Sequence, residues 1–294
     1  CRMMGARLGA VDSFRTGVLG RSWFAAWGAG GAVSGFAGGA VDAVMMRLVD
    51  VLYALPFVFF VIVLPSALYL MFGALTEFGD FPAGSGNVAG TIAVSMAVYG
   101  ATVATTSIAG TAAVERSKGW GRLLGLTPMR QAEYAAAKVL VALAIAALPV
   151  IVVFIVAALT GADIGPIGTW ISTGLITVAA SAMFALYGLT FGLLFRSESA
   201  VGAASGLLVV LAFFGNLFMP LSGTLLEIAK FTPMYGLKGL ASWPQMEGMT
   251  TGMNAAQEDS LLGLLVNVLA WTAIFAVTTL LAARRSTASA STTR

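Results

Sequence analysis

The sequence contains no histidine and a single cysteine, Cys1. The commonest ligands of zinc and haem are therefore missing, and a disulfide framework has no pair of cysteines to start from. Charged residues make up 10% of the 294 positions, whereas soluble domains carry about 25%. These shortages argue against metal centres and disulfide-stabilised domains, and they indicate that a lipid bilayer surrounds most of the chain.

Sequence motifs of nucleotide hydrolysis and of common hydrolases are absent as well. No Gly-x-x-x-x-Gly-Lys-Ser/Thr loop is present to hold nucleotide phosphates. No Gly-x-Ser-x-Gly elbow and no His-Glu-x-x-His helix occurs. We therefore expect a protein that is not an enzyme, has no catalytic residues, binds no cofactor or metal ion, and has no nucleic-acid partner.

Apolar residues are abundant. They make up 59% of the chain, and the mean hydropathy is +0.92. A membrane-spanning helix needs about 20 apolar residues in a row. A charge at the bilayer centre costs about 2.5–3.5 kcal/mol on insertion scales, so charges mark the ends of such helices. The uncharged runs predict an all-α, polytopic membrane helix bundle with six transmembrane helices, at residues 51–73, 88–114, 139–162, 164–195, 199–226 and 260–283.

The N-terminal region leaves alternatives open. Residues 22–41 are uncharged and long enough for a seventh span, but they contain six glycines, and each costs roughly 1 kcal/mol against alanine in a helix interior. Residues 41–52 have apolar positions at helical spacing, interrupted by polar ones. This pattern predicts either an amphipathic helix at the inner membrane interface or the start of the first span. Because no apolar signal segment precedes Cys1, we expect a truncated start.

Lys and Arg are unevenly distributed over the connections between the predicted spans. With the N-terminus inside, the outer connections contain only Lys230 and Lys238, together with seven acidic residues. Short basic loops stay in the cytoplasm, so the distribution predicts an N-in, C-in topology in a bacterial inner (cell) membrane. The expected organisation is a cytoplasmic or interfacial N-terminal segment at 1–50, a six-span transmembrane domain at 51–285 and a disordered cytoplasmic tail at 286–294.

One inner connection is short, basic and aromatic. It reads ERSKGWGRLLGLTPMRQAEY from Glu115 to Tyr134. Thr127 can cap a helix whose first residue is Pro128, and Trp120 lies on an apolar face before it. From these residues alone two interpretations stay open: a basic loop that fixes the topology, or a segment that docks on a cytoplasmic partner.

Three segments carry a resemblance to a known family: VERSKGWGRLLGLTPM at 114–129, GNLFMPLSG at 215–223 and FTPMYGL at 231–237. Through them, residues 57–285 resemble the permeases of type 2 ATP-binding-cassette exporters. The resemblance implies export by alternating access, powered by a cytoplasmic ATPase subunit that binds the ATP. It also implies a second permease copy, in a homodimer or heterodimer, and contact with membrane lipid. Because no charge lies deep in a predicted span, an amphipathic or apolar substrate, such as a drug, lipid or natural product, is favoured.

The same resemblance implies roles for particular residues. The first segment is similar to the loop that docks on the ATPase, which implies a coupling role for Glu115, Arg116, Gly119, Trp120, Arg122, Leu123 and Pro128. The other two are similar to a re-entrant hairpin on the outer side. In that hairpin, the helix breaks and the return of the chain would be shaped by Pro220, Ser222, Gly223, Pro233 and Gly236.

The segment at about 38–57 points to a different family. Its sequence GGAVDAVMMRLVDVLYALPF resembles the permeases of oligopeptide and dipeptide importers of the ATP-binding-cassette type. The later cytoplasmic loop typical of those importers does not follow, so the exporter is favoured. An importer permease and a non-transporting membrane scaffold stay open as alternatives.

Overall fold

The computed structural model describes residues 57–115, 131–195, 197–250 and 257–291, all of which belong to the unit that begins at Phe57. The amphipathic helix expected at 41–52 and the possible seventh span at 22–41 lie outside these residues.

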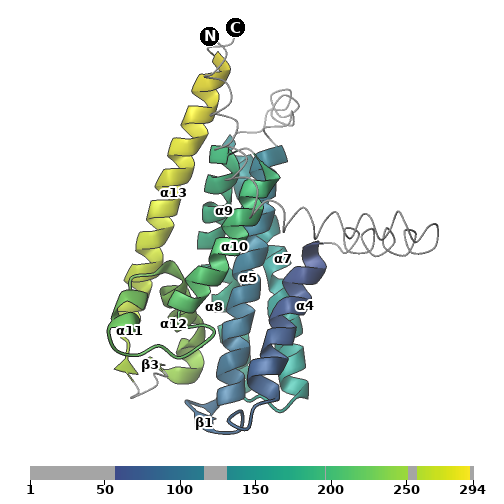
Figure 1. Cartoon of the computed structure of the whole chain (residues 1–294), viewed down its shortest axis with the longest axis vertical. Coiled ribbons are helices and arrows are strands. Elements are labelled where there is room, and N and C mark those ends of the chain that lie inside the picture. Colours follow the sequence, from purple (N-terminus) through teal and green to yellow (C-terminus); the bar gives the residue numbers. More distant parts are fainter. Residues whose placement is uncertain (1–56, 116–130, 196, 251–256, 292–294) are drawn as a thin grey trace, which may run out of the picture. The chain divides into compact units, whose positions relative to one another are not determined.

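Helices dominate the described residues, as the sequence predicted (Figure 1). Two short antiparallel strand pairs, β1 with β2 and β3 with β4, join them. The helices are α4 (Phe57–Tyr69), the π-helical turn η1 (Leu70–Ala74), α5 (Val88–Glu115), α7 (Gln131–Leu159), α8 (Ile167–Ala180), α9 (Ala182–Phe195), α10 (Glu198–Phe214), α11 (Gly223–Ala229), α12 (Pro233–Met246) and α13 (Leu261–Ser291). The strands are β1 (Pro82–Ala83), β2 (Gly86–Asn87), β3 (Met249–Thr250) and β4 (Gln257–Glu258).

Within the described residues, four helical stretches are long and apolar enough to cross a membrane, by length and composition. They are Val88–Thr111, Ala136–Leu159, Ile167–Phe195 and Leu261–Ala283. Two shorter apolar helices, Val61–Ala74 and Ala200–Phe214, fall where the first and fifth spans were predicted. A helical membrane protein is therefore supported, and six complete crossings stay a prediction.

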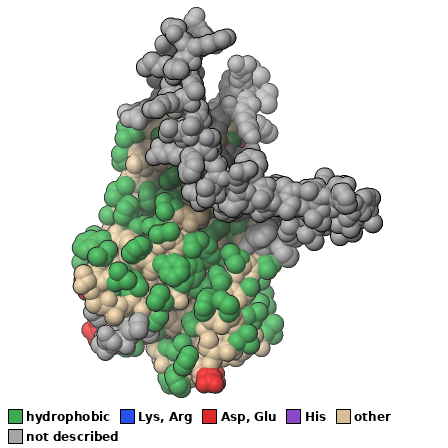
Figure 2. Space-filling view, viewed as in Figure 1, with side chains coloured by type: hydrophobic (Ala, Val, Ile, Leu, Met, Phe, Trp, Pro, Cys, Tyr) green, Lys and Arg blue, Asp and Glu red, His purple; other side chains and the backbone are tan. Residues whose placement is uncertain are grey.

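The connections between helices gather at two ends of the bundle (Figure 1). We call one the hairpin end, made of the described residues 75–87, 160–166, 215–250 and 257–260. The other is the loop end, where α5, α9 and α13 finish and α7 and α10 begin. Figure 2 shows apolar side chains over the visible face, with acidic side chains at the hairpin end. An apolar flank between polar ends is the pattern of a protein that lies in a bilayer.

The fifth predicted span, 199–226, is not one continuous helix. α10 ends at Phe214, because Gly215 leaves helical geometry and Asn216 has a positive φ of 59°. The side-chain oxygen of Asn216 accepts a hydrogen bond from the Leu221 backbone N–H over 2.8 Å, which holds the turn. The rest of the predicted span therefore forms this turn and the start of α11.

Helix α13 runs past residue 286, where the disordered tail was predicted to begin, and the predicted domain boundaries stay predictions. α13 continues as a helix to Ser291, through most of the segment that was expected to be disordered. The residues from 286 to 291 are Ser, Thr and Ala, with no glycine or proline to stop the helix.

α5 is the central helix of the described bundle. Within its apolar stretch Val88–Thr111, 83% of the residues in the most apolar window are buried, against 6% for α13. α5 contacts α4, α7, α9, α10 and α12. It contributes Val94 to one cluster of buried apolar side chains and Ala93 to another. A displacement of α5 would therefore disturb helices on all sides.

Glycines allow the neighbouring helices to approach α5 closely. A Cβ atom added at Gly188 of α9 would collide with the backbone carbonyl of Thr106 in α5. A Cβ atom at Gly100 of α5 would lie 2.9 Å from Cβ of Pro149 and 3.0 Å from Cγ of Pro65. Small residues permit such contacts between helix backbones in membranes. The sequence positions of these glycines therefore set the spacing of the bundle.

We predict that Gly188→Ala destabilises the protein and that Gly202→Ala does not. The methyl group at 188 would push α9 away from α5, and overpacking of this kind costs about 1–3 kcal/mol. Gly202 of α10 has no atom within 4 Å of an added Cβ, so alanine fits there. Thermal unfolding in detergent measures both effects. Equal unfolding temperatures of the two variants would contradict the close contact of α5 with α9.

Candidate functional sites at the two ends of the bundle

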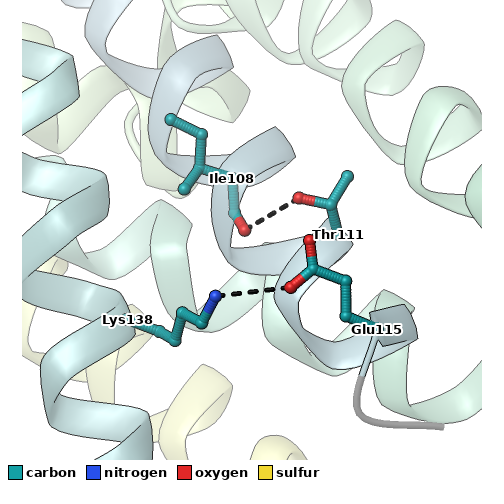
Figure 3. Close-up of polar contacts among 4 residues, drawn as sticks. All are labelled: Ile108, Thr111, Glu115 and Lys138. Carbon is teal, nitrogen blue, oxygen red and sulfur yellow. Dashed lines mark hydrogen bonds and ion pairs between the residues drawn. The ribbon is translucent and has the colours of Figure 1, made fainter. Parts of the chain in front are cut away.

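At the loop end, an ion pair joins the two helices that flank residues 116–130. Lys138 Nζ of α7 lies 3.3 Å from Glu115 Oε2 at the end of α5 (Figure 3). The two side chains are 31% and 53% exposed. Exposed pairs of this kind contribute about 0.2–1 kcal/mol, so this one positions the helix ends more than it stabilises the fold. The ion pair thus links the end of α5 to α7.

Of the seven residues predicted to dock on a partner, the structure places Glu115. The other six lie outside the described residues, and their role stays a prediction: Arg116, Gly119, Trp120, Arg122, Leu123 and Pro128. The partner of Glu115, Lys138, was expected from the sequence among the inner basic residues, on the helix that leads into the third span, and no role was assigned to it. The two residues are 23 positions apart in the chain, and they meet because α5 packs against α7. No local sequence pattern predicts this pairing.

At the hairpin end, the described segment 215–246 contains all five residues predicted for the re-entrant hairpin. Gly223 begins α11 with a φ of 59°, a left-handed conformation that glycine adopts without strain. Ser222 is the N-cap of α11, and Pro220 is exposed in the turn before it. Pro233 is the first residue of α12. Each of these residues lies in a turn or at the start of a helix, and their role in a re-entrant hairpin stays a prediction; the helix break falls earlier than predicted, at Gly215 and Asn216.

Gly236 lies where α12 meets α13. A Cβ atom at this position would collide with the side-chain oxygen of Asn267 in α13. The Asn267 amide donates hydrogen bonds to the Lys230 and Thr232 carbonyls over 2.7 and 3.2 Å. The indole N–H of Trp271 donates to the Phe231 carbonyl over 2.8 Å. Asn267 and Trp271 of α13 therefore fix the turn between α11 and α12 through hydrogen bonds to its backbone carbonyls.

Gln245, in the last turn of α12, faces the start of α5. Its amide Nε2 lies 3.3 Å from the Ala83 carbonyl, 3.2 Å from the Asn87 carbonyl and 3.1 Å from Thr91 Oγ1. The Ser85 backbone N–H donates to the Gln245 carbonyl over 2.9 Å. The side-chain oxygen of Gln245 is buried without a hydrogen-bond partner, which costs about 1–3 kcal/mol.

Lys238 was expected in an outer connection, but the structure buries it. Only 6% of its surface is exposed, and it lines a cavity of about 10 Å³ with Ser242 and Asp259. Burial lowers the pKa of Lys238 from 10.5 to about 8, and the nearby Asp259 carboxylate opposes this shift. Asp259 accepts a hydrogen bond from the Tyr235 hydroxyl over 2.6 Å. The Ser242 hydroxyl has no partner, and the cavity has room for about one water molecule.

The sequence did contain a signal for α12. The pair Thr232–Pro233 is the same N-cap pattern that was recognised at Thr127 and Pro128. In the structure, the Thr232 side chain caps α12 by accepting a hydrogen bond from the Tyr235 backbone N–H over 3.3 Å. Applying that pattern here would have predicted the helix, although not the burial of Lys238.

A groove of about 490 Å³ between α7 and α8 is lined by apolar residues only, among them Phe154, Trp170 and Leu175. Its volume is in the range of small-molecule sites. The rings of Phe154 and Trp170 meet edge to face, with their centroids 5.4 Å apart. The groove suits an apolar ligand.

Within the described residues, no group of three or more His, Cys, Asp or Glu side chains is placed to hold a metal ion.

We predict that Lys238→Met raises the unfolding temperature near neutral pH and removes a pH dependence. The unfolded chain keeps the lysine proton up to pH 10.5, whereas the folded protein releases it at about pH 8. Between these values the unfolded state binds more protons, so the stability of the original protein increases as the pH rises. Thermal unfolding in detergent across this range measures the slope. Lys230→Met, at a half-exposed lysine, should keep it. Equal slopes in the original and the Lys238→Met protein would contradict the burial of this charge.

Comparison with known proteins gives one informative similarity. No model of a known protein family matches the chain, and no solved structure matches it. The chain is similar to "Putative transport permease YvfS" of Bacillus subtilis (strain 168), with 29% identity over 141 residues. The match covers 46% of this chain and 56% of that protein, so the chain spans about half the length of its relative. This similarity and the apolar helices support a transport permease in a membrane.

Proposed function

We propose that the chain is the membrane-spanning permease subunit of an ATP-driven exporter of the type 2 ATP-binding-cassette class, in the bacterial inner membrane. The similarity to a transport permease supports the proposal, as do the segments 114–129, 215–223 and 231–237. Six spans with both termini inside would put the loop end in the cytoplasm and the hairpin end outside. A second permease copy completes the transporter. The chain performs no covalent chemistry, because a separate ATPase subunit hydrolyses the ATP.

The observation that carries the proposal is the link between residues 116–130 and α5. The segment proposed to dock on the ATPase joins the ends of α5 and α7, and the Glu115–Lys138 ion pair holds these ends together. α5 in turn contacts helices on all sides. A movement imposed on the loop would therefore reach the whole bundle and rock it between inward-facing and outward-facing states.

The proposed substrate is amphipathic or apolar. The apolar groove between α7 and α8 supports this class, because its lining offers no group for an ionic contact. The buried charge of Lys238 lies at the hairpin end, beside Asp259, and not in this groove.

Copurification with the ATPase encoded beside this chain tests the proposal. We predict that Lys138→Met leaves the yield of permease unchanged and lowers permease-stimulated ATP hydrolysis several-fold, because the ends of α5 and α7 can then separate. Lys230→Met is the matched control. It breaks a pair with Glu227 that is 2.9 Å long, with side chains 31% and 60% exposed, at the opposite end of the bundle. This control should hydrolyse ATP at the original rate.

The outcomes separate the alternatives. The Trp120→Ala, Arg122→Ala double variant should lose association with the ATPase while its membrane insertion is unchanged. Association and hydrolysis at the original level in both loop-end variants would overturn the docking role of this loop. A neighbouring solute-binding lipoprotein that also copurifies would favour an importer. Failure of the original chain to associate with any ATPase would favour a scaffold.

A further inference from the structure

The apolar groove between α7 and α8 lies in the half of the bundle nearest the hairpin end. On α7 it is lined from Ala147 to Ala158, in the second half of the apolar stretch of this helix. On α8 it is lined from Trp170 to Val178. The connection between the two helices belongs to the hairpin end, so the groove starts close to that end and runs toward the middle of the bundle.

The dimensions of the groove match one leaflet of a bilayer. A helix rises 1.5 Å per residue, so the groove is about 16 Å long on the α7 side. The hydrocarbon core of a bilayer is about 30 Å thick, and one leaflet therefore contributes about 15 Å. A volume of about 490 Å³ over this length corresponds to a channel about 6 Å wide, whereas a helix with its side chains needs about 10–12 Å. One extended acyl chain fits this channel, and a helix does not.

The groove is hollow because its floor lacks a side chain at Gly174 of α8. A Cβ atom added there would lie 3.5 Å from Cε2 of Phe154 and 3.8 Å from Cγ1 of Val150, which are ordinary contacts. Phe154 also packs edge to face on Trp170, and the Trp170 indole N–H donates to the Gly165 carbonyl over 3.1 Å. These contacts fix two aromatic rings of the lining, so the groove is formed before a ligand enters.

The two rims of the groove are bulky and apolar. Ile151 and Ile155 of α7 are each 53% exposed, and Ile171 and Leu175 of α8 are 56% and 66% exposed. Contacts between helices in membranes favour small residues that let the backbones approach each other. Large aliphatic rims on a narrow channel suit a flexible hydrocarbon chain better. A lipid is therefore favoured over a second copy of this chain.

The connection at the hairpin end of the groove favours one kind of lipid headgroup. Residues 160–166 contain the exposed acid Asp163 and no Lys or Arg. Trp170, at the same end of the groove, is a residue type that is enriched at the level of lipid headgroups. A carboxylate attracts the ammonium group of phosphatidylethanolamine and repels the net negative charge of phosphatidylglycerol. The charge at this end thus favours phosphatidylethanolamine.

We propose that the groove between α7 and α8 is a lipid-binding site that holds one acyl chain of a phosphatidylethanolamine in the leaflet at the hairpin end. The chain end lies toward Ala147 and Val178, and the headgroup lies beside the connection 160–166. The inference goes beyond the proposed function, since it depends on neither export nor an ATPase subunit.

Photochemical labelling of the purified full chain in detergent tests the site. Two phosphatidylethanolamine probes are compared, one with a diazirine near the glycerol end of an acyl chain and one with a diazirine at the chain end. After irradiation and proteolysis, mass spectrometry identifies the modified residues. The exposed apolar surface of α13, which is 6% buried in its most apolar window, reports the background from loosely bound lipid.

We expect the groove to be labelled several-fold more than α13. The chain-end probe should modify Ala147 and Val178, and the glycerol-end probe should modify Ile155 and Ile171. A phosphatidylglycerol probe should label the groove several-fold less. Equal labelling of the groove and α13, or the reverse order of the two probe positions, would overturn the site. Equal labelling by the phosphatidylglycerol probe would overturn the proposed headgroup.

Two glycines of α8 provide a matched pair of variants. Gly174→Leu places a side chain on the floor of the groove and should lower its labelling to the level of α13. Gly168→Leu makes the same change outside the groove, at a glycine with no atom within 4 Å of an added Cβ, and should leave the labelling unchanged. Undiminished labelling of the groove in Gly174→Leu would contradict the site. The comparison of the groove with α13 in the original chain needs no substitution, so it decides the proposal even if Gly174→Leu fails to fold.

Discussion

The close approach of α9 to α5 is the constraint on which the other features of the bundle depend. Because Gly188 has no side chain, α9 lies directly against the Thr106 carbonyl, and Thr106 Oγ1 reaches the Phe184 carbonyl at 3.3 Å. This contact helps to bury α5 among its neighbours. α5 also runs from the hairpin end, at Val88, to the loop end, at Glu115. It is therefore the element through which the two ends can influence each other.

The polar contacts at the two ends fit this arrangement. At the loop end, the ion pair of Glu115 with Lys138 ties α5 to α7 beside the segment proposed to meet the ATPase. At the hairpin end, the side-chain amide of Gln245 in α12 lies 3.1–3.3 Å from the Ala83 and Asn87 carbonyls and from Thr91 Oγ1 at the start of α5. A movement that begins at the loop would arrive where α5 contacts α12. The account thus joins a proposed energy input at the loop end to the hairpin end through one buried helix.

Much of this fold could be predicted from the placement of charges, because charges are costly in a bilayer and mark helix ends. The predicted span 88–114 and the observed α5 agree almost to the residue.

The helix break at Asn216 could not be predicted from charges, because it is an uncharged turn held by a side-chain oxygen. The burial of Lys238 and the contacts of Gln245 could not be predicted from the sequence for another reason. Gln245 bonds to Ala83, 162 positions earlier, and only the tertiary packing brings such residues together. The docking role of residues 116–130, which lie outside the described residues, stays a prediction from the sequence and a resemblance.

The central claim is that α5 connects events at the loop end to the hairpin end. It is tested most directly by a distance measurement between the segment before α5 and the end of α12, with spin labels at the exposed positions Asp80 and Glu247. The measurement compares the complex with the proposed ATPase subunit before and after ATP is trapped at that subunit. The account predicts that the distance distribution lengthens when ATP is bound, as α12 moves away from the start of α5. An unchanged distribution in a complex that demonstrably holds ATP would contradict it.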